Sequence, residues 1–171
     1  CALPICLTAV VTGGASGIGA GVTRVLAKAG AKVAILDRNE ALGKAMAEEV
    51  GGASFVCDVA SDESVQAAIA QAREALGAAR ILVNCAGIDT ARKITSRKTG
   101  AHPIGPMKRV VDVNLTGTLI CCAHASHAML DLEPLDEDGE RGVLINIASI
   151  AAFNAPNGQA VYGASKAGVV G

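Results

Sequence analysis

The chain has 171 residues, which is enough for one domain with a substantial core and too few for two ordinary domains. Hydrophobic residues make up 51% of it and aromatic residues only 2%, so its core must consist of Ala, Val, Ile and Leu, as in buried parallel strands covered by closely packed helices. The formal net charge of -1 provides no basic field for nucleic acid or an anionic membrane, and we expect neither as a partner.

Apolar runs alternate with segments of helical periodicity along the chain. The apolar runs predict strands at residues 7–11, 32–36, 54–56, 81–83 and 143–147. Amphipathic spacing predicts helices at residues 18–29, 40–50, 62–76, 107 to about 129, and 161–171. The predicted fold class is therefore α/β, a Rossmann-type doubly wound parallel sheet with right-handed crossovers and helices on both faces.

A glycine-rich turn, residues 12–19, joins the first predicted strand to the first predicted helix. Because glycines have no side chain, a pyrophosphate can approach the backbone of this turn closely. The N-terminus of the following helix offers unpaired N–H groups and the positive end of the helix dipole. The Gly-x-x-x-Gly-x-Gly spacing differs from the commonest dinucleotide fingerprint, so a turn without a ligand is the alternative interpretation. We expect a dinucleotide here, with contacts from Gly13, Ser16, Gly17, Ile18 and Gly19.

Asp37 lies just after the second predicted strand. A carboxylate there can accept hydrogen bonds from both adenosine ribose hydroxyls and repels a 2'-phosphate, which favours NAD over NADP. Arg38 is the competing signal, because a guanidinium at this place could bind that phosphate. The alternative is that Arg38 is a solvated charge at the start of a loop.

Polar residues near the end of the chain could carry acid–base chemistry. Tyr162 and Lys166 are four residues apart on a predicted helix, so they share one face, and an ammonium within roughly 4 Å would lower the tyrosine pKa toward neutral pH. Ser149 follows the fifth strand, at the edge where ligands bind in such sheets, although a serine can also simply cap a turn. Asn114 lies inside a predicted helix, where asparagine is a poor helix former and suggests a specific role.

The order and spacing of these motifs, with two further segments, resemble the short-chain dehydrogenase/reductase family over nearly the whole chain. The segments that carry the resemblance are 12–19, Asp58-Val59, Asn84-Cys85-Ala86-Gly87, Asn114, Ser149 and Tyr162-Gly163-Ala164-Ser165-Lys166. The resemblance implies that Asn114, Ser149, Tyr162 and Lys166 form a catalytic tetrad. By the same likeness Tyr162 exchanges the proton, Ser149 polarises the substrate oxygen, Lys166 also binds the nicotinamide ribose, and Asn114 holds a water that relays protons.

The family likeness also assigns cofactor contacts and an assembly. It implies that Asp58 meets the adenine, with Val59 beside it, and that Asn84, Ala86 and Gly87 line the cofactor site. Cys85 stands where the family often has Asn, a departure that the neighbouring residues should tolerate. The helices containing Asn114 and Tyr162 resemble the family's dimer-forming pair, which implies a homodimer or homotetramer.

Within the family, the segments 84–88, 90–106, 112–118 and 140–146 resemble type II 3-hydroxyacyl-CoA dehydrogenases. The expected function is hydride transfer between NAD and a secondary alcohol or ketone, with a 3-hydroxyacyl-CoA as substrate. The alternatives are another ketone, such as an acyl-carrier-protein thioester, a steroid or a sugar, and a cofactor-binding protein without activity. The insertion 90–106 is either a lid over an acyl chain or a solvated surface loop. Its basic residues either meet a CoA phosphate or face solvent. This basic cluster comprises Arg92, Lys93, Arg97 and Lys98.

Residues 1–171 are interpreted as one dinucleotide-binding and catalytic domain that lacks its substrate-binding C-terminal part, because the chain ends inside a predicted helix. Since it opens on Cys1, we also expect residues before it. If these residues were the whole product, the fifth strand would be an open hydrophobic edge prone to association. The run 1–11 contains no basic residue and is much shorter than a span of roughly 20 residues, so we expect neither a signal peptide nor an anchor.

The remaining cysteines and histidines suggest no further chemistry. His124 and His127 are three apart, but a third zinc ligand is not evident, and the acidic run 131–140 lacks the spacing of an EF-hand, so we expect no metal. The cysteines contain no Cys-x-x-Cys pair and most lie in apolar runs, which predicts buried free thiols in a reducing, cytoplasmic setting; they are Cys1, Cys6, Cys57, Cys85, Cys121 and Cys122.

Overall fold

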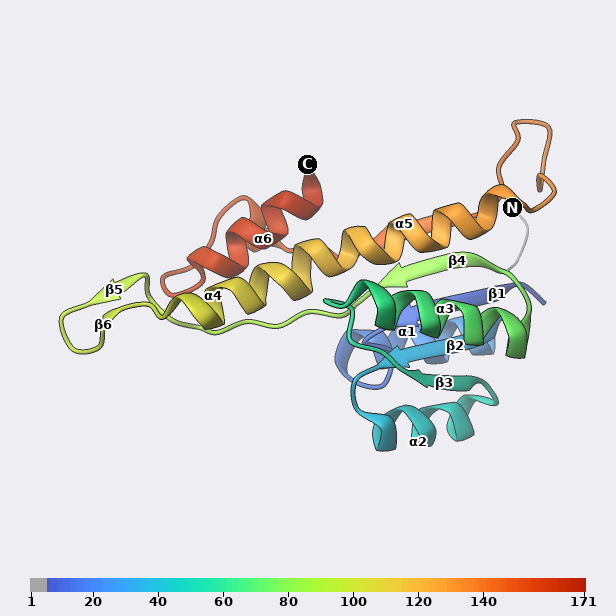
Figure 1. Ribbon diagram of the computed structural model, residues 1–171, viewed down its shortest axis with the longest axis horizontal. Coiled ribbons are helices and arrows are strands. Elements are labelled where there is room, and N and C mark those ends of the chain that lie inside the picture. The colour runs from blue at the N-terminus through green and yellow to red at the C-terminus, as the bar shows by residue number, and fades with distance from the viewer. Residues whose placement is uncertain (1–5) are drawn as a thin grey trace.

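A parallel sheet lies in the right-hand part of the computed structural model, which describes residues 6–171 (Figure 1). Its five strands lie in the order β3-β2-β1-β4-β7, and all neighbours are parallel. The strands are β1 (Thr8–Thr12), β2 (Lys32–Asp37), β3 (Ala53–Val56), β4 (Ala79–Asn84) and β7 (Val143–Asn146). Each predicted strand is confirmed, with its ends shifted by at most two residues.

Helices cover both faces of the sheet, as the doubly wound prediction requires. They are α1 (Gly17–Lys28), α2 (Glu40–Val50), α3 (Asp62–Leu76), α4 (Ile104–Val111), α5 (Gly117–Leu130) and α6 (Ala160–Val170). One buried cluster joins Val10 and Leu82 of the sheet to α3 and α5, and the other joins Val11 and Val83 to α1 and α2. Successive strand residues therefore feed opposite layers, which explains why these strands are apolar throughout.

Two parts of the chain differ from the predicted elements. The polar stretch before residue 107 contains a small antiparallel hairpin of β5 (Thr95–Ser96) and β6 (Gly100–Ala101), and α4 begins already at Ile104. The long predicted helix is interrupted by one π-helical turn, η1 (Asp112–Thr116), between α4 and α5. This wider turn faces residues 85–88, where Asn114 makes its hydrogen bonds.

Strand β7 lies at the edge of the sheet next to β4. Its apolar residues Val143, Leu144 and Ile145 are between 36% and 46% exposed. Among residues 6–171, no helix combines the length and the apolar character needed to cross a membrane. The first five residues of the N-terminal run 1–11 lie outside the described part of the chain.

Candidate active site

The carboxyl ends of β1, β4 and β7 meet at one edge of the sheet, and a groove runs along it. The larger hollow, of about 610 Å³, lies between the glycine turn and helix α6. A smaller hollow, of about 330 Å³, lies between the same turn and the ends of β2 and β3. Both are lined by Gly13, Ser16 and residues 86–88, so we treat them as one groove. Its position between β1 and its two neighbours is where open α/β sheets bind ligands.

The glycine turn needs its glycines for two different reasons. Gly13 has a φ of 61°, and a Cβ there would come within 2.9 Å of the Ala86 backbone. A Cβ on Gly19 would lie 2.1 Å from the Gly13 carbonyl oxygen, so only glycine lets α1 begin against the turn. Ser16 precedes the helix without a capping hydrogen bond from its side chain, and Ile18 is 67% exposed. The helix N-terminus therefore opens onto the groove, with room for a pyrophosphate.

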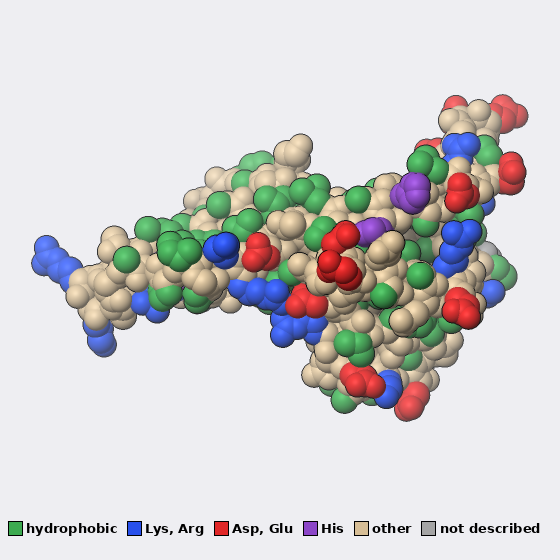
Figure 2. Space-filling model, in the orientation of Figure 1, with side chains coloured by type: hydrophobic (Ala, Val, Ile, Leu, Met, Phe, Trp, Pro, Cys, Tyr) green, Lys and Arg blue, Asp and Glu red, His purple; other side chains and the backbone are tan. Residues whose placement is uncertain are grey.

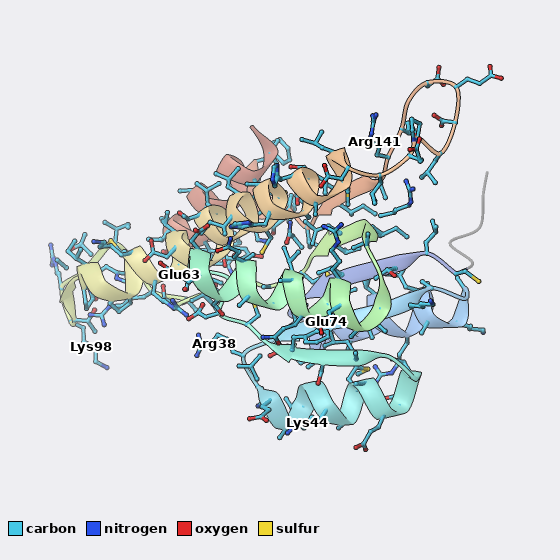
Figure 3. All side chains as sticks on the ribbon, turned by 45° about the vertical axis from the view of Figure 1, so that its right-hand side comes forward. Arg38, Lys44, Glu63, Glu74, Lys98 and Arg141 are labelled. Atoms are coloured by element: carbon cyan, nitrogen blue, oxygen red, sulfur yellow. The ribbon has the colours of Figure 1, made fainter. Side chains whose placement is uncertain are left out.

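Asp37 lies where the sequence places the ribose contact. Its two carboxylate oxygens accept hydrogen bonds from the backbone N–H groups of Ala15, at 3.1 Å, and Asn39, at 2.9 Å. These bonds fix the carboxylate on the smaller hollow, next to the glycine turn. Arg38 lines the same hollow, and its side chain extends away from α2 and the sheet (Figure 3). Asp37 and Arg38 therefore both line the smaller hollow, and two backbone hydrogen bonds hold the Asp37 carboxylate there.

Asp58 and Val59 line the smaller hollow together with Asp37. The Asp58 carboxylate accepts hydrogen bonds from the Ala60 N–H, at 3.1 Å, and from the Arg109 guanidinium, at 2.8 Å. Partial burial works to raise the pKa of Asp58, but the hydrogen bonds and the nearby positive charges outweigh it and lower that pKa. Arg109 was not singled out in the sequence, because one more charge on a helix carries no distinguishing signal.

Asn84 does not line the groove, contrary to the expectation, whereas Cys85, Ala86 and Gly87 do. Its side chain is 4% exposed and points between strands, where the amide donates to Asn146 Oδ1 at 2.9 Å and accepts from the Thr12 hydroxyl at 3.3 Å. As the last residue of β4 it takes its direction from the strand pleat. Its place in the structure is that of a support beneath the loop 85–88.

The residues predicted for acid–base chemistry meet on the larger hollow, which Ser149, Tyr162 and Lys166 all line. Lys166 is 5% exposed, and its Nζ donates to the Ile147 carbonyl at 2.6 Å and lies 5.9 Å from the centre of the Tyr162 ring. Burial lowers the pKa of Lys166, while the neighbouring Cys85 thiol works in the opposite direction. The ammonium is therefore fixed by the backbone of the neighbouring strand end rather than by the tyrosine hydroxyl.

Ser149 has both of the roles weighed for it in the sequence. Its Oγ accepts a hydrogen bond from the Ala151 N–H at 3.2 Å and caps the short 3-10 helix η2 (Ile150–Ala152). The cap uses an acceptor site and leaves the hydroxyl proton free to donate. Capping thus orients the serine on the hollow that Tyr162 also lines.

Asn114 is fully buried and lies behind the groove rather than on it. Its Oδ1 accepts from the Ile88 N–H at 2.8 Å, and its Nδ2 donates to the Ile88 carbonyl at 2.9 Å and to Ser165 Oγ at 3.0 Å. The Ser165 hydroxyl in turn donates to the Tyr162 carbonyl at 2.7 Å. One buried chain of hydrogen bonds thus joins the loop after β4, the π turn and helix α6. Ser165 was noted in the sequence only as part of a motif.

The other candidate residues do not join this site. His124 Nε2 lies 2.8 Å from Asp62 Oδ1, and within residues 6–171 no three His, Cys, Asp or Glu side chains are grouped to hold a metal. Among the described cysteines, which are free thiols, Cys57 and Cys121 are buried as expected. Burial raises the pKa of Cys57 to about 11. Cys6 is exposed, and Cys1 lies outside the described residues.

The insertion contains the β5–β6 hairpin and carries basic residues at its end. His102 is 3% exposed, and its ring nitrogens lie 3.1 Å from the Thr90 hydroxyl and 2.9 Å from the Pro103 carbonyl oxygen. Arg92 donates to the Thr99 carbonyl across the hairpin at 3.1 Å. Figure 2 shows Lys and Arg side chains gathered at this end of the molecule, and Figure 3 places Lys98 at its tip.

Comparison with known proteins gives the context of this site. The family model for short chain dehydrogenases matches residues 7–171. The 3-hydroxyacyl-CoA dehydrogenases type-2 of Bos taurus and Homo sapiens are each 43% identical over 168 residues, covering 96% of this chain and 64% of the relative. Human 3-oxoacyl-[acyl-carrier-protein] reductase is 34% identical over 163 residues, covering 94% of this chain and 64% of its own length.

A solved structure extends the likeness to three dimensions. The crystal structure of 3-hydroxyacyl-CoA dehydrogenase type-2 from Mycobacterium avium superposes with a TM-score of 0.89 at 35% identity, covering 98% of this chain and 66% of that one. The chain therefore spans just under two thirds of the length of the curated relatives it matches. With the family model matched from residue 7 to the last residue, the chain belongs to the short-chain dehydrogenase family.

Proposed function

We propose that the protein is an NAD-dependent oxidoreductase that interconverts a secondary alcohol and its ketone. The observation that carries this proposal is the larger hollow, where the glycine turn faces Ser149, Tyr162 and Lys166 across one cavity. The turn and the Asp37 carboxylate fit the pyrophosphate and the adenosine ribose of a dinucleotide. When bound, this cofactor supplies or accepts the hydride.

The proton is handled by the protein's own residues. Tyr162 Oη gives a proton to the carbonyl oxygen during reduction and takes it back during oxidation. Ser149 donates its free hydroxyl proton to the same oxygen and so stabilises the charge that develops there. The fixed Lys166 ammonium favours the tyrosinate, and it does so from a buried position where its charge is weakly screened. Asn114 keeps the loop at Ile88 and the helix of Tyr162 in register.

The proposed substrate is a 3-hydroxyacyl-CoA. Relatives named 3-hydroxyacyl-CoA dehydrogenase type-2 support it, and so do the exposed Lys93, Arg97 and Lys98 of the insertion, whose charges suit CoA phosphates. An acyl-carrier-protein thioester is the second candidate, because a relative of that name also matches. The test is a comparison of kcat/KM for a 3-oxoacyl-CoA and for the same acyl group on acyl carrier protein, measured by NADH oxidation. A preference for the carrier protein would overturn the first assignment.

The proposed cofactor is NAD and not NADP. The fixed Asp37 carboxylate supports this choice, since it would face a 2'-phosphate at close range. Dissociation constants for NAD and NADP test the proposal. In Asp37→Asn the ratio of the Kd for NADP to the Kd for NAD should fall by roughly tenfold, because one repulsive charge is lost. Tighter binding of NADP by the unchanged protein would mean that Arg38 decides instead.

Two further proposals concern the setting of the protein. A homodimer or homotetramer is supported by large apolar side chains exposed on α4 and α5, namely Ile104, Leu119 and Leu130. Light scattering during gel filtration measures the assembly, and a monomer at micromolar concentration would contradict it. A reducing, cytoplasmic setting is supported by the free thiols, and fractionation of cells tests it.

A further inference from the structure

A carboxylate and an amide meet at the rim of the larger hollow. Asp89 is the first residue after the loop 85–88, and Gln159 precedes α6 one turn before Tyr162. The Gln159 Nε2 donates to Asp89 Oδ2 at 3.1 Å, and both residues line the same hollow as Ser149 and Tyr162. The chain just before the insertion and the N-terminal end of α6 are therefore joined at the edge of this hollow.

The charge on Asp89 is not neutralised by the groups that hydrogen-bond to it. Its other oxygen accepts from the Ala91 N–H at 3.1 Å, and within residues 6–171 no Lys, Arg or His nitrogen lies within 4.0 Å of its carboxylate. Lys166 is the other charged residue that lines the hollow, but it is 5% exposed and is bound to the Ile147 carbonyl. Asp89 is exposed and lines the hollow, so it places a negative charge at the rim.

We propose that Asp89 is a specificity-determining residue that disfavours ketones and alcohols with a free carboxylate close to the reacting carbon, an inference that rests on the proposed function. In a free 3-oxo acid the carboxylate is separated by one carbon from the carbonyl that Tyr162 protonates, so both groups enter the same hollow. Like charges brought together at such a site repel each other. In a thioester the corresponding group is neutral, and Asp89 opposes the free acid without opposing the ester.

The hydrogen bond from Gln159 holds the Asp89 carboxylate in the position that this selection requires. A lone exposed carboxylate would turn toward solvent, where water screens its charge. The bond from the Gln159 amide, together with the bond from the Ala91 N–H, holds both oxygens of Asp89 at the rim. Gln159→Ala should therefore weaken the discrimination in the same direction as loss of the charge, although by less.

The experiment compares two substrates of equal acyl length. Acetoacetate is the anion, and S-acetoacetyl-N-acetylcysteamine is the neutral thioester; both are reduced with NADH, and kcat/KM is measured for each. Asp89→Asn keeps a hydrogen-bonding side chain and removes the charge. The ratio of kcat/KM for acetoacetate to that for the thioester should rise roughly five- to tenfold in Asp89→Asn. In the unchanged protein, added salt should raise the same ratio, and this dependence should shrink in the variant.

Asp138→Asn is the matched control, since it removes one exposed carboxylate from the loop between α5 and β7. It should leave the ratio unchanged. An unchanged ratio in Asp89→Asn, with the thioester still reduced, would overturn the role of Asp89 and leave the proposed function standing. Failure of the unchanged protein to reduce either substrate with NADH or NADPH would overturn the proposed function and this inference with it.

Discussion

The two ends of the groove are built in different ways. At the end proposed for adenosine, Asp37 and Asp58 accept hydrogen bonds from backbone N–H groups, and Asp58 also accepts one from Arg109, while both side chains stay partly exposed. At the catalytic end, Lys166 and Asn114 are buried, and their hydrogen bonds join residues far apart in the sequence. Binding a nucleotide tolerates solvated contacts, whereas the proposed proton transfer needs groups that are fixed and buried.

The sharpest way to separate the two ends is to remove the phenol hydroxyl. Tyr162→Phe should lower kcat by roughly 10²–10⁴-fold, the usual contribution of a general acid or base. NAD affinity should remain within about twofold, because the adenosine end is untouched. Steady-state rates and titration calorimetry measure the two effects. Equal turnover in the variant would refute the role given to Tyr162.

The glycine turn lies where the two ends of the groove join, and it should tolerate no added side chain at Gly19. Gly19→Ala places a Cβ against the Gly13 carbonyl and should lower the free energy of unfolding by roughly 3 kcal/mol, at the upper end of overpacking costs, and weaken NAD binding. Gly21→Ala is the control, because Gly21 lies in the same helix with no neighbouring atom within 4 Å. That variant should be more stable by roughly 0.5–1 kcal/mol in urea unfolding. Equal behaviour of the two would remove the steric explanation.

The buried chain of hydrogen bonds at the catalytic end can be broken at Ser165. Ser165→Ala leaves the Asn114 amide with one partner fewer and should cost about 1–2 kcal/mol of unfolding free energy, with a fall in kcat larger than any change in KM. Ser126→Ala removes a hydroxyl that makes a similar bond to the carbonyl three residues earlier, but on an exposed face. Its unfolding free energy should change by less than about 0.5 kcal/mol. Comparable losses of unfolding free energy in both variants would show that the buried hydrogen bonds of Ser165 add no stability of their own.

The smallest expected effect lies at the adenosine end. Because the folded pKa of Asp58 is lowered, its stabilising contribution is present above the unfolded pKa, near ~3.9, and is lost as pH falls through the folded value. The Asp58 and Arg109 side chains are 38% and 37% exposed, so screening by solvent keeps this contribution below about 1 kcal/mol. Unfolding measured from pH 6 downward should show a shallower acid loss in Arg109→Gln. An identical acid limb would mean that the ion pair contributes nothing.

The sequence predicted those features that repeat or that require a particular residue type. Five apolar runs predicted the sheet, and the glycine spacing predicted a turn whose contacts admit only glycine at residue 19. The sequence also predicted that Ser149, Tyr162 and Lys166 lie near one another, since residues at the carboxyl ends of parallel strands and on the following helix share an edge of the sheet. In the structure all three line one hollow.

Features that depend on side-chain direction or on a single extra residue were missed. Asn84 was expected in the groove because its motif adjoins it, yet the strand pleat turns it inward toward Asn146. The partnership of Arg109 with Asp58 depends on how α4 packs, which no local pattern records. The hairpin at 95–101 has strands of two residues, too short for any periodicity. The assignment of residues 1–171 to one truncated domain stays a prediction.

The π turn at Asp112–Thr116 also acts as an angular offset within one continuous helical rod. Each residue of an α-helix advances the chain by about 100°, so one extra residue in a turn rotates everything before it by that amount relative to everything after it. Here α4 faces α6 and carries the hairpin, while α5 faces β4 and α3. Deleting one residue from this turn would rotate α4 and the hairpin before it by about 100° relative to α5.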